Sequence, residues 1–207
     1  MKTSKLSERI GSKNLGLELE LYRNFLDDAH QHFERLQTEI AWAQGDIQVF
    51  GKQHPVPRLE AWYADPDCTY SYSRRRLDPL PWTNHLLELR QKCSDVLRMP
   101  FNSVLLNRYR DGKDGMGWHA DNESELGVAP AIASLSLGAT RRFRLRRKDR
   151  RHAGMTIELG DGDLLLMRGE TQQYWEHCVT RTATSVSERI NATFRLILGG
   201  DRQRNDS

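Results

Sequence analysis

The sequence is poor in the features that mark secreted and membrane proteins. It contains only three cysteines, Cys68, Cys93 and Cys178, and no CxxC spacing, so we expect no disulfide framework. It has no apolar run of about 18 residues, the minimum for a membrane-spanning helix. The polar start MKTSKLSERIGSKN lacks the apolar segment of a secretory signal. These absences favour a reducing compartment, either the cytoplasm of a bacterium or the nucleus of a eukaryote.

Net charge is also small, but it is concentrated in one segment. The 207 residues carry a formal net charge of +3, whereas residues 141–151, RRFRLRRKDRR, hold eight basic residues and one acid, a net +7. The rest of the chain therefore sums to −4. A focused basic segment is typical of a surface that binds a polyanion. The alternative is an arginine-rich strand and turn that water alone solvates.

The spacing of apolar residues predicts two helices followed by a run of strands. Phe33, Leu36 and Ile40 recur at helical spacing after Asp27 and Asp28, which favour a helix start. Pro81 is expected to open a second helix that ends near Arg98. Beyond Pro100, short strand-like runs alternate with turn signals such as DGKDG and GDGD. This order predicts an α+β fold in which about six to eight strands form a sandwich or barrel.

The length suits a single domain. We expect residues 1–15 to be a flexible lead-in, residues 16–200 to form the domain and residues 201–207 to be a tail. The strands would occupy residues 100–200. Segment 46–80, rich in Pro, Tyr and Arg, is expected to be a long functional loop.

Two histidines and an aspartate are candidate metal ligands. His119 and Asp121 lie two positions apart in GWHADNE, so on a strand both side chains would reach one ion. His177 follows in YWEHCV, whereas His152 lies inside the basic segment, where a cation would be repelled. Together His119, Asp121 and His177 match the set that holds Fe(II) and leaves positions open. Taken alone, the His-Asp pair is a weak signal and is better explained as polar residues that share no metal.

A second set of polar residues predicts an anion site near that metal. Four of them alternate along one strand, ERINATFR: Arg189, Asn191, Thr193 and Arg195. Burying two guanidiniums on one face is costly unless an anion is present. A dicarboxylate fits, because a guanidinium donates two parallel hydrogen bonds to a carboxylate. Asn107 and Tyr109, in LLNRY, offer an amide and a phenol from another strand.

Several segments resemble the AlkB-type Fe(II)/2-oxoglutarate-dependent dioxygenases, most closely the members that repair duplex DNA and their bacterial relatives. These segments are NRYRDGKDGMGWHADNE, IASLSLGATRRFRLRRKD, LGDGDLLLMRGETQQYWEHCV and RINATFR. The resemblance implies a double-stranded β-helix (jelly-roll) core with flanking N-terminal helices and a nucleotide-recognition lid. It implies Fe(II) held by His119, Asp121 and His177, with 2-oxoglutarate and O₂ as cosubstrates. The implied 2-oxoglutarate site comprises Asn107, Tyr109, Arg189, Asn191, Thr193 and Arg195. Which arginine meets which carboxylate stays open.

The resemblance also implies contacts with DNA and with a flipped base. QVFGK resembles a finger whose apolar tip, Phe50, would fill the gap left by the base. Tyr70 and Tyr72 would stack on the base, and Glu123 would contact its polar edge. Asn122 stands where the duplex-repair members have an aspartate, and Trp118 either packs or lines the pocket. The expected DNA contacts are Val49, Phe50, Gly51, Lys52, Arg58, Arg142, Arg144, Arg146, Arg147, Lys148 and Arg151.

We therefore expect an enzyme that oxidatively removes N-alkyl lesions, such as N1-methyladenine and N3-methylcytosine, from DNA after base flipping. Its partner would be alkylated DNA, duplex as well as single-stranded, bound by a monomer that needs no membrane. Two alternatives stay open. One is a 2-oxoglutarate oxygenase that acts on RNA, protein or lipid, and the other is a nucleic-acid-binding module without catalysis.

Overall fold

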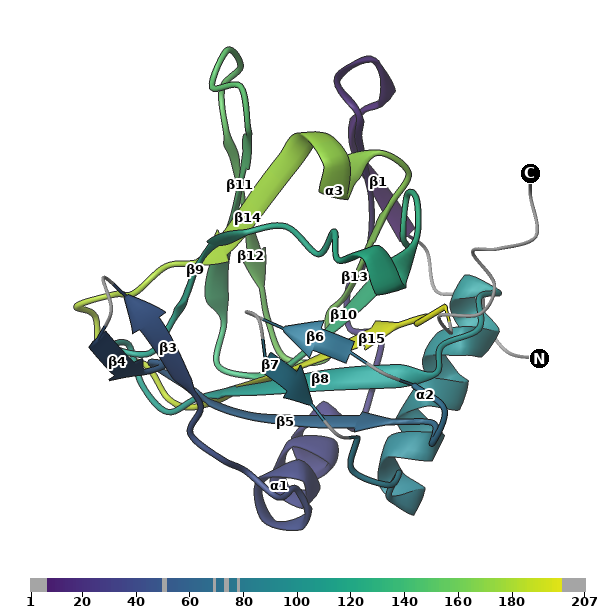
Figure 1. Ribbon diagram of the computed structural model, residues 1–207, viewed down its shortest axis with the longest axis vertical. Coiled ribbons are helices and arrows are strands. Elements are labelled where there is room, and N and C mark those ends of the chain that lie inside the picture. The colour runs from purple at the N-terminus through teal and green to yellow at the C-terminus, as the bar shows by residue number, and fades with distance from the viewer. Residues whose placement is uncertain (1–6, 50–51, 69, 73–74, 78, 199–207) are drawn as a thin grey trace.

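Two antiparallel sheets face each other, and two helices cover the far side of the larger one (Figure 1). The computed structural model describes residues 7–49, 52–68, 70–72, 75–77 and 79–198. The larger sheet contains, in spatial order, β1 (Ser7–Ser12), β2 (Leu17–Tyr22), β13 (Leu164–Arg168), β10 (Ile132–Gly138), β15 (Arg189–Arg195), β8 (Ser103–Tyr109) and β5 (Leu59–Ala64). The smaller sheet contains β12 (Met155–Leu159), β11 (Arg141–Arg147), β14 (Trp175–Val179) and β9 (Met116–His119). This arrangement confirms the predicted α+β class with a double-stranded β-helix core.

The two predicted helices form, with one boundary changed. α1 (Ala29–Glu39) begins directly after Asp28, as the sequence indicates. α2 (Asn84–Leu97) begins later than expected, because the Thr83 side chain accepts a hydrogen bond from the Leu86 backbone N–H and caps the helix. Pro81 therefore precedes the helix instead of opening it. Among the described residues, no helix is long and apolar enough to cross a membrane.

Strand alternation divides the buried residues into two layers. On β8, Val104 and Leu106 belong to the apolar cluster shared with α1 and α2. Leu105 and Tyr109 belong to the cluster between the two sheets. The period of two puts alternate side chains on opposite faces. The polar residues Asn107 and Tyr109 therefore share the face that looks toward the smaller sheet.

The N-terminal boundary differs from the expectation. Residues 7–15 were expected to be part of a flexible lead-in, but β1 pairs with β2 over its whole length, from Ser7↔Tyr22 to Ser12↔Leu17. The 3₁₀ turn η1 (Lys13–Leu15) joins the two strands. A left-handed Gly16 ends that turn, with φ 65°. The expected tail, residues 201–207, lies outside the described residues.

The expected lid segment is not one continuous loop. Its middle part, β5, is a strand of the larger sheet and pairs with β8 from Leu59↔Arg108 to Ala64↔Ser103. Two hairpins flank it: β3 (Asp46–Val49) with β4 (Lys52–Pro55), and β6 (Tyr70–Tyr72) with β7 (Arg75–Leu77). Core pairing therefore anchors the segment at its centre, and the two hairpins are the parts that lie outside the main sheets.

Candidate metal centre

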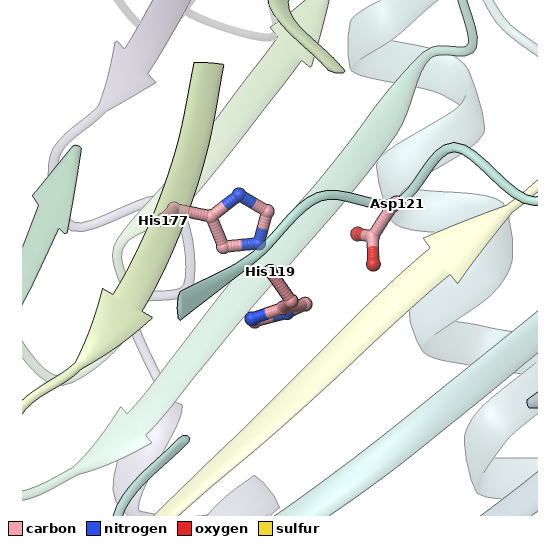
Figure 2. Close-up of side chains that lie close together, drawn as sticks. All are labelled: His119, Asp121 and His177. Atoms are coloured by element: carbon pink, nitrogen blue, oxygen red, sulfur yellow. The ribbon is translucent and has the colours of Figure 1, made fainter. Parts of the chain in front are cut away.

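His119, Asp121 and His177 converge between the two sheets (Figure 2). His119 is the last residue of β9, and His177 lies opposite it on β14. Their ring centroids are 4.3 Å apart. Each of the three side chains offers one ligand atom, and these atoms all lie within 4.8 Å of one another. The fold therefore brings all three predicted ligands to one point.

Asp121 reaches this point by a different route from the one expected. The spacing of two residues predicts that Asp121 shares a strand with His119, but β9 ends at His119 and Asp121 lies in the following loop. Its backbone N–H donates to Gln172 Oε1 at 2.9 Å. Its Oδ1 accepts from Arg195 Nη2, also at 2.9 Å. Contacts from α3 (Thr171–Tyr174) and β15 thus hold the aspartate where no strand does.

The protonation states of the three groups suit metal binding. His119 Nδ1 lies 2.9 Å from the Gly117 carbonyl oxygen; since a carbonyl only accepts, Nδ1 carries the proton and Nε2 keeps its lone pair. Burial, followed by the nearby His119, lowers the pKa of His177 to about 3. Burial alone would raise the pKa of Asp121, but Arg195 and the two histidines outweigh it and the pKa falls. At neutral pH the buried His177 is therefore a neutral imidazole and Asp121 a carboxylate. With the imidazole of His119 they make up the residue types of an Fe(II) site with open positions.

Arg189 is fully buried near this centre and keeps unused hydrogen-bond donors. Its side chain is 1% exposed, and its Nη2 donates to Ser136 Oγ at 2.9 Å. Its Nε and Nη1 have no hydrogen-bond partner among the described residues. Burial lowers the pKa of Arg189, and the nearby Tyr109 acts in the opposite direction. Tyr109 nevertheless makes no well-formed hydrogen bond with Nε or Nη1 of Arg189. A buried guanidinium with two idle donors indicates a missing anion.

The other residues of the predicted diacid site line one cavity with the candidate metal ligands. They are Asn107, Tyr109, Asn191, Thr193 and Arg195. Ser134, which the sequence analysis did not single out, fixes Asn191 by accepting from its Nδ2 at 2.9 Å. Ser134 and Ser136 alternate within the apolar strand IASLSLG, and that pattern is the signal that could have revealed them. Their strand β10 pairs with β15, so both hydroxyls face the polar row.

Arg58 is not a surface residue, which corrects its assignment as a DNA contact. It is 4% exposed, its Nε donates to Asn107 Oδ1 at 2.8 Å, and its Nη2 lies 3.1 Å from Glu60 Oε2. Because the guanidinium only donates, Asn107 must direct its oxygen at Arg58 and its N–H₂ group elsewhere. Arg58 therefore sets the orientation of a cavity-lining amide.

Trp118 is likewise not among the residues that line the cavity. Arg146 Cζ lies 3.8 Å from the centroid of its ring, and Arg144 Cζ lies 5.8 Å away. Trp118 precedes His119 on β9, and alternation turns it to the outer face of the smaller sheet. This placement favours the packing alternative for Trp118, and its contact with the base stays a prediction. Asn122 is exposed and Glu123 is partly buried in the loop after Asp121, and their roles stay predictions.

The basic segment is less available to a partner than its composition indicates. Arg141 is buried and donates to three backbone carbonyl oxygens. Arg146 pairs with Glu176, Arg147 lies near Asp149, and Lys148 Nζ donates to the Gln172 carbonyl. Among the described residues of the segment, the exposed basic side chains with neither a close acidic partner nor a hydrogen bond to the backbone are Arg144 and Arg151, together with Arg142, whose distance to Glu158 is 3.9 Å.

The expected finger is a hairpin. Val49 on β3 pairs with Lys52 on β4. Phe50 and Gly51, the expected tip, lie outside the described residues. Tyr70 and Tyr72 occupy β6, paired with Leu77 and Arg75 of β7.

Comparisons with known proteins agree with this site. The profile of the 2OG-Fe(II) oxygenase superfamily matches residues 18–195. The chain is 40% identical over 181 residues to the DNA oxidative demethylase ALKBH2 of Bos taurus, which covers 83% of this chain and 65% of that protein. The human ALKBH2 is 40% identical over 181 residues, or 69% of its length. The alpha-ketoglutarate-dependent dioxygenase alkB homolog 3 of Rattus norvegicus is 39% identical over 188 residues, or 63% of its length.

The matched part of the chain thus spans about two thirds of the length of these curated relatives. Among solved structures, that of OsALKBH1 superimposes with a TM-score of 0.63 at 17% sequence identity, covering 92% of this chain and all of the other. That likeness concerns the fold and confirms the arrangement of the two sheets.

Proposed function

Because this chain belongs to the 2OG-Fe(II) oxygenase superfamily, we propose that it is an Fe(II)- and 2-oxoglutarate-dependent dioxygenase that removes N-alkyl groups from DNA bases. The observation that carries the proposal is the meeting of His119, Asp121 and His177 in a cavity that Tyr109 also lines, with the buried guanidinium of Arg189 and its idle donors next to Tyr109. The relatives named as DNA oxidative demethylases support the substrate class. N1-Methyladenine and N3-methylcytosine are the proposed lesions.

The two arginines of β15 would have different tasks. Arg195 is already bonded to Asp121, so it belongs to the metal end of the cavity. Arg189 would bind the distal carboxylate of 2-oxoglutarate through its idle Nε and Nη1. Tyr109, whose ring centroid lies 5.3 Å from Arg189 Cζ, would add a hydroxyl there. This division is our proposal for how the two arginines share the cosubstrate and the metal centre.

The remaining polar residues would orient the cosubstrate. With its oxygen held by Arg58, Asn107 presents its N–H₂ group as a donor. Asn191 is fixed by Ser134, and its Oδ1 in turn accepts from the Thr193 hydroxyl. When bound, Fe(II) with 2-oxoglutarate and O₂ supplies the oxidation of an N-alkyl carbon, which leaves as an aldehyde with succinate and CO₂ as coproducts. Phe143, stacked 5.0 Å from His177, helps to exclude water from that side.

The substrate would approach from the hairpin side of the molecule. Tyr70 and Tyr72 would stack on the flipped base, and Asn122 and Glu123 would contact its polar edge. A cationic N-alkylated base would be favoured by an aromatic and acidic surrounding. The exposed Arg142, Arg144 and Arg151 would bind phosphates, and the finger residues Val49 to Lys52 would occupy the gap in a duplex.

The direct test supplies the protein with Fe(II), 2-oxoglutarate and an oligonucleotide that contains N1-methyladenine. Restored adenine and stoichiometric succinate are expected on single-stranded and on duplex substrate. Asp121→Ala, which removes a metal ligand, should abolish both products. Absence of turnover by the iron-loaded protein on both substrates would contradict the proposal. Matched RNA oligonucleotides in the same assay distinguish DNA repair from RNA demethylation.

The finger is tested by comparing duplex with single-stranded turnover. Phe50→Ala should reduce duplex turnover selectively, because the unstacking of a flipped base costs a few kcal/mol per step and an inserted ring offsets part of it. His54→Ala, at an exposed position of the same hairpin, serves as the control. An equal loss on both substrates would rule out a wedge at Phe50.

A further inference from the structure

The backbone of the metal ligand Asp121 depends on a side chain far away in sequence. Since β9 ends at His119, the Asp121 N–H has no partner in the ladder that β9 forms with β14. It donates instead to Gln172 Oε1 at 2.9 Å, in a buried contact across 51 residues of sequence. The amide orientation follows from chemistry, because only the oxygen of Gln172 accepts from an N–H. The other end of that amide, Nε2, contacts Met167 Sδ at 3.5 Å, which is a weak acceptor.

Gln172 is itself held firmly in place. It is 1% exposed and lies in the short helix α3, directly before the strand that carries His177. Thr171 accepts from the Glu18 backbone N–H at 2.9 Å and donates to the Arg168 carbonyl at 2.7 Å, which ties α3 to β2 and β13. Lys148 Nζ donates to the Gln172 carbonyl oxygen at 2.9 Å. The acceptor that faces Asp121 is therefore fixed from several directions.

Asp121 is thus held at two places by two different residues. Arg195 Nη2 donates a hydrogen bond to Oδ1 of the carboxylate. Gln172 takes the backbone N–H and fixes the loop that presents the carboxylate. Partners that orient a metal ligand in this way raise metal affinity, because the ligand does not have to be ordered when the ion binds.

We propose that Gln172 is a positioning residue of the metal centre, which pre-orders Asp121 for the ion through its backbone amide. The inference rests on the proposed Fe(II) site and deepens it. Gln172 does not touch the metal ion, so its effect is expected in metal affinity and in ligand geometry. A residue that acted only through general packing would change the stability of the metal-free protein and leave the geometry of the bound ion unaltered.

The test is a titration of the metal-free protein with Co(II), a redox-stable ion whose visible absorption reports the ligand geometry. Gln172→Met keeps the length of the side chain and removes the acceptor, and the Co(II) affinity should fall about tenfold with a changed absorption band. Gln173→Met is the matched control, since Gln173 is the exposed neighbour in the same helix. Its affinity and spectrum should equal those of the wild type.

Thermal unfolding of the metal-free variants accompanies the titration. If Gln172→Met does not fold, Gln172→Asn replaces it, because the shorter amide cannot reach the Asp121 N–H, and the same loss is expected. A Co(II) affinity and spectrum of the folded Gln172 variant equal to those of Gln173→Met would overturn the proposal. Failure of the wild type to bind Co(II) would instead contradict the metal site itself, so the two failures are distinguishable.

Discussion

At the scale of single residues, the guanidinium of Arg189 is a buried charge that is expected to cost stability. A buried charge without a counterion destabilises a fold, and its replacement by an apolar residue is often neutral or stabilising. The chain nevertheless keeps Arg189 at 1% exposure with two idle donors. We interpret this as stability given up for the binding of an anion.

Arg189→Met should therefore separate binding from stability. The KM for 2-oxoglutarate should rise between about 10- and 100-fold, because a hydrogen bond to a charged group contributes about 1.5–3 kcal/mol. The metal-free protein should unfold at the same or a higher temperature. Steady-state kinetics and thermal unfolding measure the two effects, with Arg142→Met at an exposed position as the control. A KM unchanged from that control would remove Arg189 from the cosubstrate site.

Arg58 offers a second test at this scale, because its two possible roles predict different measurements. Arg58→Lys keeps a positive charge beside Glu60 but loses the planar donor that fixes Asn107. Loss of about one hydrogen bond, roughly 1 kcal/mol, should raise the KM for 2-oxoglutarate about fivefold. The salt dependence of DNA binding should not change. A phosphate contact would instead lower the salt slope by about 0.9 and leave the KM unaltered.

At the scale of elements, a pair of buried histidines joins the two covering helices. His32 of α1 stacks on His85 of α2 with ring centroids 4.9 Å apart, and Nδ1 of the first lies 2.6 Å from Nε2 of the second. Asp28 lies 3.2 Å from the far nitrogen of His32, and Glu39 lies 3.4 Å from that of His85. Burial, then Arg35 and His32, lower the pKa of His85 below its ordinary value of 6.5.

The lowered pKa of His85 predicts a loss of stability in mild acid. As pH falls below about 6.5, His85 becomes protonated in the unfolded chain but stays neutral in the folded chain. The free energy of unfolding therefore has its full value above that pH and declines below it. The buried His177, with its pKa near 3, adds to the same decline in the metal-free protein. His85→Gln removes one of the two titrating groups and should flatten the decline between pH 7 and 5.5.

Urea unfolding of the metal-free protein at several pH values measures this effect. His30→Gln on the same helix is the control, because the His30 side chain is 75% exposed, and its pH profile should match that of the wild type. If His85→Gln shows the full wild-type decline, the helix pair does not contribute to acid sensitivity.

At the scale of the whole molecule, the charge is unevenly arranged, although the structure neutralises part of it. Residues 141–151 carry a net +7 in a chain of +3. Glu176 lies between Arg146 and Arg150, whose hydrogen bonds overcome the effect of burial and lower its pKa. The exposed arginines on β11, Arg142 and Arg144, are therefore the better candidates for phosphate contacts.

The salt dependence of DNA affinity tests this assignment. In the inactive Asp121→Ala background, the logarithm of the affinity should fall steeply with the logarithm of salt concentration. Arg142→Gln and Arg144→Gln should each reduce that slope by about 0.9. Lys92→Gln on α2, on the helical side of the larger sheet (Figure 1), should leave it unchanged. Slopes in the two arginine variants equal to that of Lys92→Gln would exclude β11 from the DNA surface.

Local pattern in the sequence predicted the fold class and the three residues that converge in the candidate metal centre. The alternation in ERINATFR and LLNRY predicted two polar rows, and both face the same cavity. The predicted helices and the strands after Pro100 are present. Both kinds of element could be predicted because apolar residues recur about every 3.6 positions in a helix and every two positions in a strand, and this spacing is visible in the sequence. The three ligands were also found by residue type and position, without knowledge of which strands pair.

Only the tertiary structure decided which side chains orient the site residues through hydrogen bonds and which side chains face the solvent. Gln172 is 51 residues from Asp121, and Arg58 is 49 residues from Asn107. Such contacts depend on the pairing of distant elements, and a single sequence does not encode that pairing in its local pattern. The composition of the basic segment likewise does not show which of its arginines are exposed and which are buried or paired. Burial of Arg141 and pairing of Arg146 with Glu176 depend on neighbours that only folding brings near.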